Sequence, residues 1–394
     1  MTTRVRTGLM VMLVLATMGL ASCGHYTCGV TFGNSTCNAG PPGLNGGGNA
    51  TGTVFIYQLG QSNSNGTTIV AASLDLSTNK FQEDINFVPP PLPSTFPTDG
   101  GTVVVSKGSQ KYLYVPFSNG TLYGYAIDGT TGALTAVPNI PYSAAGGTSI
   151  ASDPAGNFLF VSDSTTNVIS VFTIAADGSL TAVANSPFPS QISAAQMTTD
   201  GKGQFLFAAT GPPGGTQIAA FSITSGVGTL TPVVNSPFTP GFSVSKLLGE
   251  NTGTYLFGIN GQTADLYVFT INSGVPTPLA SPFVTAAIPV DLVVHPSGKF
   301  VYTFDGPSAP MEGYQITSGG VLVKVNGSPF TGVDLEKGEF DQSGLFLFGV
   351  GLGAGTTFGP YDTDISTGAI SLSTFPLVGF LGHGFAVTDL NNAP

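Results

Sequence analysis

One aromatic residue recurs along this chain at a nearly constant spacing, and each copy opens a short apolar run. Successive copies are 46, 47, 50, 45 and 46 residues apart, and they are Tyr112, Phe158, Phe205, Tyr255, Phe300 and Phe346. A period of this length that carries only strand-like patterns is typical of the four-stranded blade of a β-propeller. The sequence therefore predicts one large array of blades rather than several separate domains.

The composition fits a secreted all-β protein. Only 8% of the residues are charged, whereas 55 are Gly and 29 are Pro, so turns are abundant and helices with charged faces are scarce. The formal net charge is −11, and the only arginines are Arg4 and Arg6 near the N-terminus. Because nucleic-acid binding requires clustered Lys and Arg, we expect no nucleic-acid partner.

Three short marks recur within the repeats. A turn that ends in Gly precedes the aromatic residue, as in residues 153–158 and 295–300. A Gly-x-Leu turn follows, as in residues 178–180, and a Ser-Pro-Phe segment closes the repeat, as in residues 186–188. Gly and Pro at these positions suit tight turns between antiparallel strands, and Pro ends the pairing of an outer strand.

These marks predict how the ring closes. They define six complete repeats between about residues 98 and 382, and an incomplete repeat at 53–91 that lacks its inner strand. Residues 384–389 match the inner strand of a later repeat and are expected to supply the missing one. The predicted fold is a seven-bladed β-propeller of four-stranded antiparallel blades, in which the C-terminal strand completes the first blade.

The N-terminus has the features of a targeting segment. Arg4 and Arg6 precede an apolar stretch at residues 9–20, which is too short for a stable transmembrane helix. A Leu-Ala-Ser-Cys tetrad that ends at Cys23 follows, and it resembles a bacterial lipobox. The resemblance implies cleavage before Cys23, acylation of that residue, and an extracytoplasmic protein anchored to the membrane by lipid. An ordinary secretory signal is the alternative.

Residue 24 and the domain boundaries refine this interpretation. Gly24 stands where Asp would retain a lipoprotein at the inner membrane, so a Gram-negative host would sort this protein to the outer membrane. The expected organisation is a signal peptide at 1–22, a Gly-rich lipidated tether at 23–52 and the propeller at 53–394.

Two cysteines remain when Cys23 carries lipid. In an oxidising compartment Cys28 and Cys37 are expected to form a disulfide within the tether. A metal site that adds His25 is the alternative, but this set lacks a fourth ligand and the usual paired spacing. We expect no metal and no cofactor.

The repeat also resembles a known family. Residues 159–163 (Leu-Phe-Val-Ser-Asp) and 167–171 (Asn-Val-Ile-Ser-Val) look like the Tyr-Val-Thr-Asn type of propeller repeat. The whole repeat, from about residue 53 to 391, is similar to the lactonase-type seven-bladed propellers, the family of 6-phosphogluconolactonase and carboxy-muconate cyclase. A WD40 repeat is disfavoured because the chain has no Trp. The resemblance implies hydrolysis of a lactone by an Arg-His pair, but the matching positions hold Val290 and Asp291.

A candidate site is expected where the inner strands begin, because these positions surround one mouth of a propeller's central channel. The candidate catalytic residues are His383, Glu336 and Asp291, and the candidate ligand-binding residues are Lys246, Lys337, Gln196, Asp163 and Asp305. A mixed acidic and basic cluster can position a water molecule or hold a polar ligand. The alternative is a ring of solvated loop residues without a specific ligand.

The two histidines of the repeats differ in their expected roles. His295 occupies the blade turn at the position of Asp153 in another repeat, so it is expected to cap that turn. His383 lies near the expected channel mouth and is the better candidate for a general base.

Two functions are consistent with these features. The first is a membrane-anchored binding or interaction module for an envelope protein, a glycan or a small polar ligand, and we expect it to be monomeric. The second is a lactonase-like hydrolase in which His383 acts with Glu336 or Asp291 in place of the family's usual pair.

Overall fold

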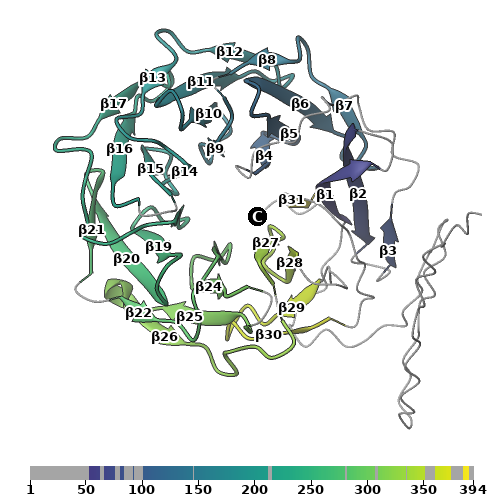
Figure 1. The fold of residues 1–394 in the computed structure, drawn as a ribbon. Coiled ribbons are helices and arrows are strands. Elements are labelled where there is room, and N and C mark those ends of the chain that lie inside the picture. Colours follow the sequence, from purple (N-terminus) through teal and green to yellow (C-terminus); the bar gives the residue numbers. More distant parts are fainter. Residues whose placement is uncertain are drawn as a thin grey trace, which may run out of the picture.

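The protein is a ring of small antiparallel sheets around a central channel (Figure 1). This computed structural model describes residues 53–62, 66–75, 80–83, 92, 101–144, 146–211, 215–279, 282–306, 309–333, 335–350, 360–373 and 385–389. All regular elements in these ranges are strands, apart from one short 3-10 helix, η1 (Ser318–Gly320). The same ranges contain no helix that is long and apolar enough to span a membrane. The predicted all-β propeller is therefore confirmed.

Six of the sheets are formed by strands that follow one another in the chain. The first contains β4 (Val103–Lys107), β5 (Gln110–Pro116), β6 (Thr121–Ile127), β7 (Leu134–Ala136) and β8 (Tyr142–Ser143). The second contains β9 (Ser149–Ser152), β10 (Phe158–Asp163), β11 (Val168–Ile174), β12 (Leu180–Ala182) and β13 (Phe188–Pro189). The third contains β14 (Gln196–Thr199), β15 (Phe205–Ala209), β16 (Ile218–Ile223) and β17 (Leu230–Pro232).

The next three sheets repeat this order. The fourth contains β18 (Lys246–Gly249), β19 (Tyr255–Asn260), β20 (Asp265–Asn272), β21 (Val275–Pro278) and β22 (Phe283–Val284). The fifth contains β23 (Asp291–Val294), β24 (Phe300–Phe304), β25 (Glu312–Ile316) and β26 (Leu322–Lys324). The sixth contains β27 (Lys337–Phe340), β28 (Phe346–Val350), β29 (Tyr361–Thr363) and β30 (Ile370–Leu372).

A further sheet joins the two ends of the described chain. It has the strand order β3-β2-β1-β31 and contains β1 (Thr53–Ser62), β2 (Gly66–Asp75), β3 (Lys80–Glu83) and β31 (Phe385–Asp389). Strand β31 pairs antiparallel with β1 in the inner position that β9 occupies in its own sheet. The inner strands then adjoin one another in the order β4, β9, β14, β18, β23, β27 and β31, and β31 adjoins β4. The predicted closure by the C-terminal strand is confirmed, because β31 completes the sheet of β1 and joins the ring of inner strands.

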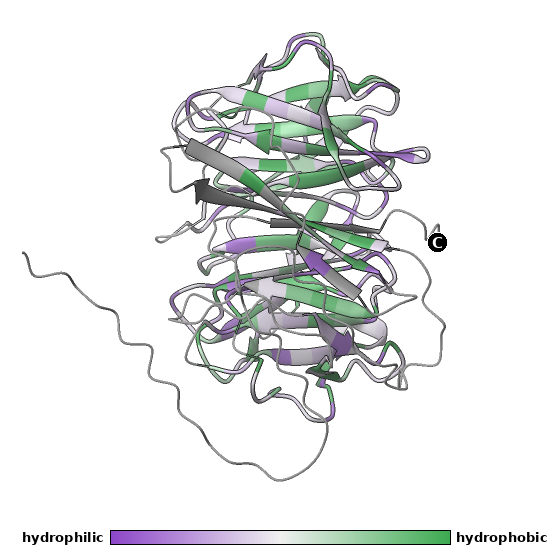
Figure 2. Cartoon of the chain, turned by 90° about the vertical axis from the view of Figure 1, so that its right-hand side faces the viewer, coloured by the Kyte–Doolittle hydropathy of each residue, from purple (hydrophilic) through white to green (hydrophobic). Residues whose placement is uncertain are grey.

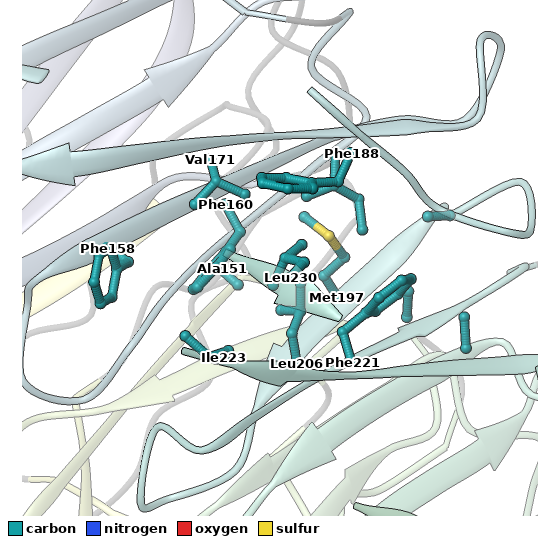
Figure 3. Packing of buried hydrophobic residues seen from close by; sticks show 14 of the residues in the cluster. Ala151, Phe158, Phe160, Val171, Phe188, Met197, Leu206, Phe221, Ile223 and Leu230 are labelled. Atoms are coloured by element: carbon teal, nitrogen blue, oxygen red, sulfur yellow. The ribbon is translucent and has the colours of Figure 1, made fainter. Parts of the chain in front are cut away.

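The middle strands of a blade are buried on both faces. All six residues of β10 are buried, whereas in the outer strand β12 only Leu180 is buried. A blade is covered by a neighbour on each side, so its middle strands are continuous apolar runs rather than alternating ones. Figure 2 shows this distribution from the side, with hydrophobic residues concentrated in the strands. Figure 3 shows Phe160 of one blade and Leu206 of the next within a single apolar cluster.

The repeated aromatic residue of one blade contacts the Gly-x-Leu turn of the next. Gly228 has a φ of +80°, and a Cβ atom built on it would lie 2.5 Å from two ring carbons of Phe158. The described residues contain this contact at six blade interfaces, as Phe55–Gly132, Tyr112–Gly178, Phe158–Gly228, Phe205–Gly274, Tyr255–Gly320 and Phe300–Gly368. Glycine is therefore required for two reasons: the backbone has a positive φ, and the aromatic ring occupies the position of a Cβ atom.

The Ser-Pro-Phe segments fasten the outer edge of each blade to its third strand. The Ser186 hydroxyl accepts a hydrogen bond of 2.8 Å from the Val171 N–H. The same contact recurs between Ser236 and Ala220 at 2.9 Å. It recurs again between Ser328 and Gly313, at 3.0 Å. The serine of this mark thus satisfies a backbone donor that the short outer strand leaves unpaired.

Gly228→Ala should destabilise the propeller strongly, because the added methyl group clashes with Phe158 in a left-handed backbone conformation. We expect a loss of about 2–4 kcal/mol in the free energy of unfolding, measured by chemical denaturation. Gly226→Ala is the matched control, since Gly226 has a φ of +70° in the same turn but nothing within 4 Å of a built Cβ. Equal losses in the two variants would show that the contact with Phe158 contributes nothing.

Candidate functional site at the channel mouth

Successive inner strands begin with polar residues at one end of the channel. Five successive inner strands, β9, β14, β18, β23 and β27, pair with the strand that follows each in the chain. Their first residues occupy the same register position. The residues at this position are Ser149, Gln196, Lys246, Asp291 and Lys337. Four of the predicted site residues therefore lie at equivalent places around one mouth, which we call the mouth ring.

Lys246 and Asp291 form an ion pair between neighbouring blades. The Lys246 Nζ atom lies 2.6 Å from Oδ1 of Asp291, and the side chains are 29% and 8% exposed. The same carboxylate oxygen accepts a hydrogen bond of 2.8 Å from the Leu292 N–H. Because Asp291 is nearly buried and Lys246 is not, the pair presents a fixed ammonium group to the channel.

The next blade contributes Glu336 and Lys337, which are adjacent in sequence. Glu336 is partly buried and Lys337 is exposed. Burial raises the pKa of Glu336, and the charge of Lys337 partly opposes that rise. Among the described residues, no hydrogen bond or ion pair joins Gln196 or Lys337 to another member of the mouth ring.

Asp163 at the end of β10 is already engaged in its own turn. Its carboxylate accepts hydrogen bonds from the Thr165 N–H at 2.8 Å, the Thr166 hydroxyl at 2.6 Å and the Gly146 N–H at 3.3 Å. Burial acts to raise the pKa of Asp163, but these hydrogen bonds outweigh it and lower the pKa below its ordinary value. Asp163 therefore fixes the loop at the mouth in a charged state, and its role in ligand binding remains a prediction.

Asp305 occupies the equivalent position after β24 but has the opposite environment. It is 7% exposed, and neither carboxylate oxygen has a hydrogen-bond partner among the described residues. Burial and the nearby charge of Glu312 raise the pKa of Asp305 to about 7. The Thr303 hydroxyl and the Ala287 N–H favour the charged form, although neither makes a hydrogen bond of good geometry to it.

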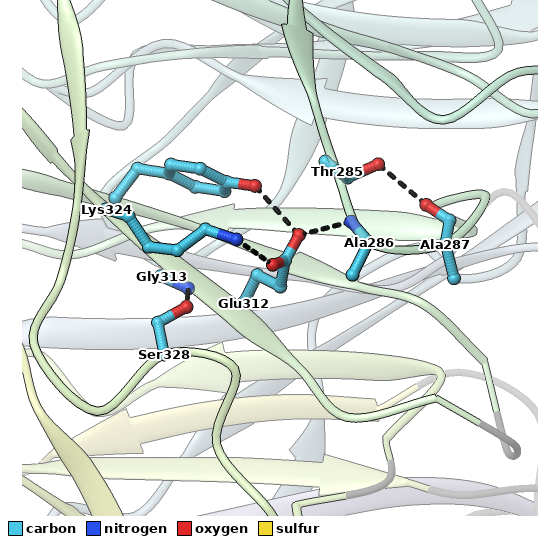
Figure 4. Close-up of polar contacts among 8 residues, drawn as sticks. Thr285, Ala286, Ala287, Glu312, Gly313, Lys324 and Ser328 are labelled. Atoms are coloured by element: carbon cyan, nitrogen blue, oxygen red, sulfur yellow. Dashed lines mark hydrogen bonds and ion pairs between the residues drawn. The ribbon is translucent and has the colours of Figure 1, made fainter.

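Glu312 is the centre of a buried polar network next to Asp305 (Figure 4). It is fully buried, and it accepts hydrogen bonds from the Tyr314 hydroxyl at 2.8 Å and the Ala286 N–H at 2.7 Å. Its other oxygen forms a close ion pair with Lys324. Lys324 is therefore the cation near two carboxylates, those of Glu312 and Asp305. It pairs with Glu312, so Asp305 has no ion-pair partner among the described residues.

Sequence reasoning missed Glu312, Tyr314 and Lys324. By its register Glu312 stands where other repeats have Ser170 or Ala219, two residues before the aromatic of the third strand. A carboxylate at a position that is small and buried in those two repeats was the available signal.

His295 caps its turn, as predicted. It is 1% exposed, its Nδ1 atom accepts a hydrogen bond of 3.0 Å from the Ser297 N–H, and Nε2 lies 2.9 Å from the Gly344 carbonyl oxygen. The N–H therefore resides on Nε2 and joins this turn to the next blade. Burial lowers the pKa of His295, so the residue is neutral at physiological pH.

Several predictions fall outside the described residues. They concern the candidate base His383, the lipidation site Cys23 and the disulfide between Cys28 and Cys37. Within the described ranges, no group of three or more His, Cys, Asp or Glu side chains is placed to hold a metal ion. The mouth ring itself combines ammonium, carboxylate and amide groups, which can bind a ligand that carries several hydroxyl groups.

The closed ring of four-stranded blades defines the class of this fold as a β-propeller. Its fold is similar to that of a candidate 6-phosphogluconolactonase from Bacteroides uniformis, with a TM-score of 0.65 and 16% identity over 86% of this chain and 98% of that one. The periplasmic gluconolactonase of Pseudomonas aeruginosa is also similar, with a TM-score of 0.62 and 15% identity over 85% and 98%.

A candidate 6-phosphogluconolactonase from Bacteroides fragilis has a TM-score of 0.65 and 14% identity over 88% of this chain and 99% of that one. No protein-family profile and no curated protein sequence matches the chain. The predicted resemblance to lactonase-type propellers is therefore confirmed by the fold.

Asp305→Asn should stabilise the protein at neutral and alkaline pH. Folding raises the pKa of Asp305 from its ordinary 3.8 to about 7. Stability is therefore lost as pH rises between these two values, and the loss is complete above the higher one. An amide of the same shape carries no charge, so we expect the melting temperature of the variant to exceed that of the wild type at pH 8, with the gain shrinking towards pH 4.

Asp163→Asn is the control for this prediction. The pKa of Asp163 is lowered by its hydrogen bonds, so this substitution should reduce the melting temperature at pH 8. An Asp305→Asn variant that melts at or below the wild-type temperature at pH 8 would show that other groups stabilise the negative charge of Asp305.

Proposed function

We propose that this protein is a lipid-anchored extracytoplasmic propeller that binds a small polyhydroxylated ligand, of the sugar-acid class, at the mouth ring. The ion pair of Lys246 with Asp291 carries the proposal. It presents ammonium donors and a carboxylate acceptor at fixed positions on the channel wall, and hydroxyl groups need both. Gln196 on one side and Lys337 on the other extend this set around the mouth.

The lysines of the mouth ring support an anionic group on the ligand. Outside the targeting segment the chain has no arginine, so lysines are its only permanent cations. Lys337 is exposed and has no ion-pair partner among the described residues, which leaves its ammonium group free to meet a carboxylate. A lysine recognises a carboxylate as a point charge rather than through the two parallel hydrogen bonds of arginine, so we expect modest affinity.

A lactone hydrolase is the second candidate, and the likeness to the P. aeruginosa periplasmic gluconolactonase favours it. In this function His383, Glu336 or Asp291 would act in place of the Arg-His pair that the resemblance implies. The binding function ranks first because Val290 and Asp291 occupy the positions of that pair, and because Asp291 is already committed to Lys246.

Lys246→Met should weaken ligand binding, since it removes the ammonium donors but keeps the length of the side chain. With gluconate and glucono-δ-lactone as probes, isothermal titration calorimetry should show a loss of about 10- to 100-fold in affinity, the usual effect of losing a hydrogen bond to a charged group. Gln196→Leu tests the same ring without breaking the ion pair. The matched control is Lys202→Met, because Lys202 is an exposed lysine in the turn between β14 and β15, at the opposite end of the inner strand.

The same samples separate the two candidate functions. Lactone hydrolysis above the spontaneous rate that disappears in His383→Ala would establish the hydrolase. Binding of gluconate without turnover would establish the binding module. Wild-type protein that neither binds nor hydrolyses either probe would refute the assignment of a sugar-acid ligand.

The membrane anchor rests on the lipobox alone and has its own test. Cys23→Ser should remove acylation and move the protein from the membrane fraction to the soluble fraction of the bacterial envelope. A variant that still sediments with membranes would contradict lipid anchoring at this residue.

A further inference from the structure

A short loop at the channel mouth exposes two large apolar side chains and buries a polar one. This mouth loop, residues 285–290, connects β22 to β23. The side chains of Ile288 and Val290 are 46% and 53% exposed. Thr285 is only 4% exposed, and its hydroxyl donates a hydrogen bond of 2.6 Å to the Ala287 carbonyl oxygen. Because Ile288 and Val290 contribute little hydrophobic stabilisation, polar contacts help the buried Pro289 to hold the loop in place.

Two backbone N–H groups tie the mouth loop to the fifth blade, and a third, that of Thr285, donates to the Ala264 carbonyl oxygen of the fourth blade at 2.9 Å. The Ala286 N–H donates to Glu312 at 2.7 Å, and the Val290 N–H donates to the Phe304 carbonyl oxygen at 2.8 Å. Asp305 follows Phe304 directly and lies between the two ties in reach of both Ala287 and Glu312. Ionisation of Asp305 therefore places a buried charge next to Glu312, which holds the Ala286 N–H of the loop.

The buried carboxylate of Asp305 has no hydrogen bond or ion pair among the described residues to stabilise a negative charge. Both carboxylate oxygens of Asp305 and the hydroxyl oxygen of Thr303 are buried without a hydrogen-bond partner among the described residues. A protonated Asp305 carries no charge and can donate to the Thr303 oxygen, whereas ionisation places a buried charge beside that of Glu312. We propose that Asp305 is a proton-binding site that holds the mouth loop closed when protonated and loosens it when ionised.

The groups around Asp305 indicate that this carboxylate binds a proton rather than a metal ion. They are Glu312 and Tyr314 on β25 and Lys324 on β26, and the mouth loop adds backbone groups and Thr285. Lys324 is bound to Glu312, so ionisation of Asp305 creates a second buried negative charge beside the first. The raised pKa of Asp305, about 7, agrees with this geometry. A calcium ion would need about six to eight oxygen ligands. The oxygens of Glu312 already accept two hydrogen bonds and form one ion pair, so they are not free to bind the ion.

The sign of the effect follows from the raised pKa. The closed loop binds the proton more tightly than the open loop, so closing is favoured at low pH and is progressively lost as pH rises towards about 7. Above that value Asp305 is ionised in both states, and no further loss occurs. The proposal does not depend on which ligand the mouth ring binds.

Amide hydrogen exchange of the full-length protein tests the proposal. The readout is the protection of a peptide that covers residues 283–290, as the ratio of the measured rate to the rate of an unstructured chain at the same pH. For a group whose pKa is about 7 when closed, linkage predicts that protection falls about tenfold between pH 6 and pH 8. Asp305→Asn should show the same protection at both values.

Two further variants make the outcome specific. Asp163→Asn changes the equivalent, hydrogen-bonded carboxylate and should keep the tenfold fall in the peptide of residues 283–290. Glu312→Gln removes the neighbouring charge and should reduce the fall. Wild-type protection that is equal at pH 6 and pH 8 overturns the proposal, and so does an Asp305→Asn variant that keeps the wild-type pH dependence.

Discussion

At six blade interfaces of the described chain, an aromatic ring of one blade lies against a glycine of the following blade and positions it. The turn that carries the glycine needs a left-handed backbone conformation, and the ring needs the space that a Cβ atom would fill. At three interfaces a tyrosine hydroxyl also donates to the carbonyl oxygen of the same glycine, as Tyr57 does to Gly132 at 2.6 Å. Because the turn conformation of one blade and the aromatic ring of the other both determine this contact, it fixes how far one blade is rotated relative to the next. Repetition of that one rotation is what closes the ring.

The functional site depends on this geometry because it has no element of its own. The mouth ring consists of the first residues of five inner strands, so its members come together only when the blades are in register around the channel. Lys246 and Asp291 are 45 positions apart in sequence and belong to different sheets, yet their side chains meet at 2.6 Å. A distorted blade interface would therefore separate the ion pair without altering either residue.

Much of this architecture could be predicted from the sequence because the signals are local and repeated. Turn glycines, the aromatic residue and the Ser-Pro-Phe segment each report on a few neighbouring residues, and the constant period turns them into blades. The closing strand was predictable for the same reason, since residues 384–389 carry the pattern of an inner strand. The positions of Gln196, Lys246, Asp291 and Lys337 also followed from the period.

The contacts between side chains could not be predicted in this way. Whether Lys246 meets Asp291 depends on the rotation between two blades, which no local pattern encodes. Asp163 and Asp305 occupy the same register position, but one is satisfied by its own turn and the other is buried without a partner. That difference arises from Glu312 and Lys324 on the two outer strands of the blade, and a search confined to the inner strands does not reach them.

Two buried titratable groups of the same sheet respond to pH in opposite directions. Asp305 follows β24 at the mouth, and His295 follows β23 at the other end, because β23 and β24 are antiparallel. Burial lowers the pKa of His295, so its contribution to stability is lost as pH falls below its ordinary value of 6.5. The contribution of Asp305 is lost as pH rises from 3.8 to about 7. Acidification therefore tightens the mouth of this blade while it weakens the contact of His295 with the next blade, so a measurement of global stability alone would partly cancel the two effects.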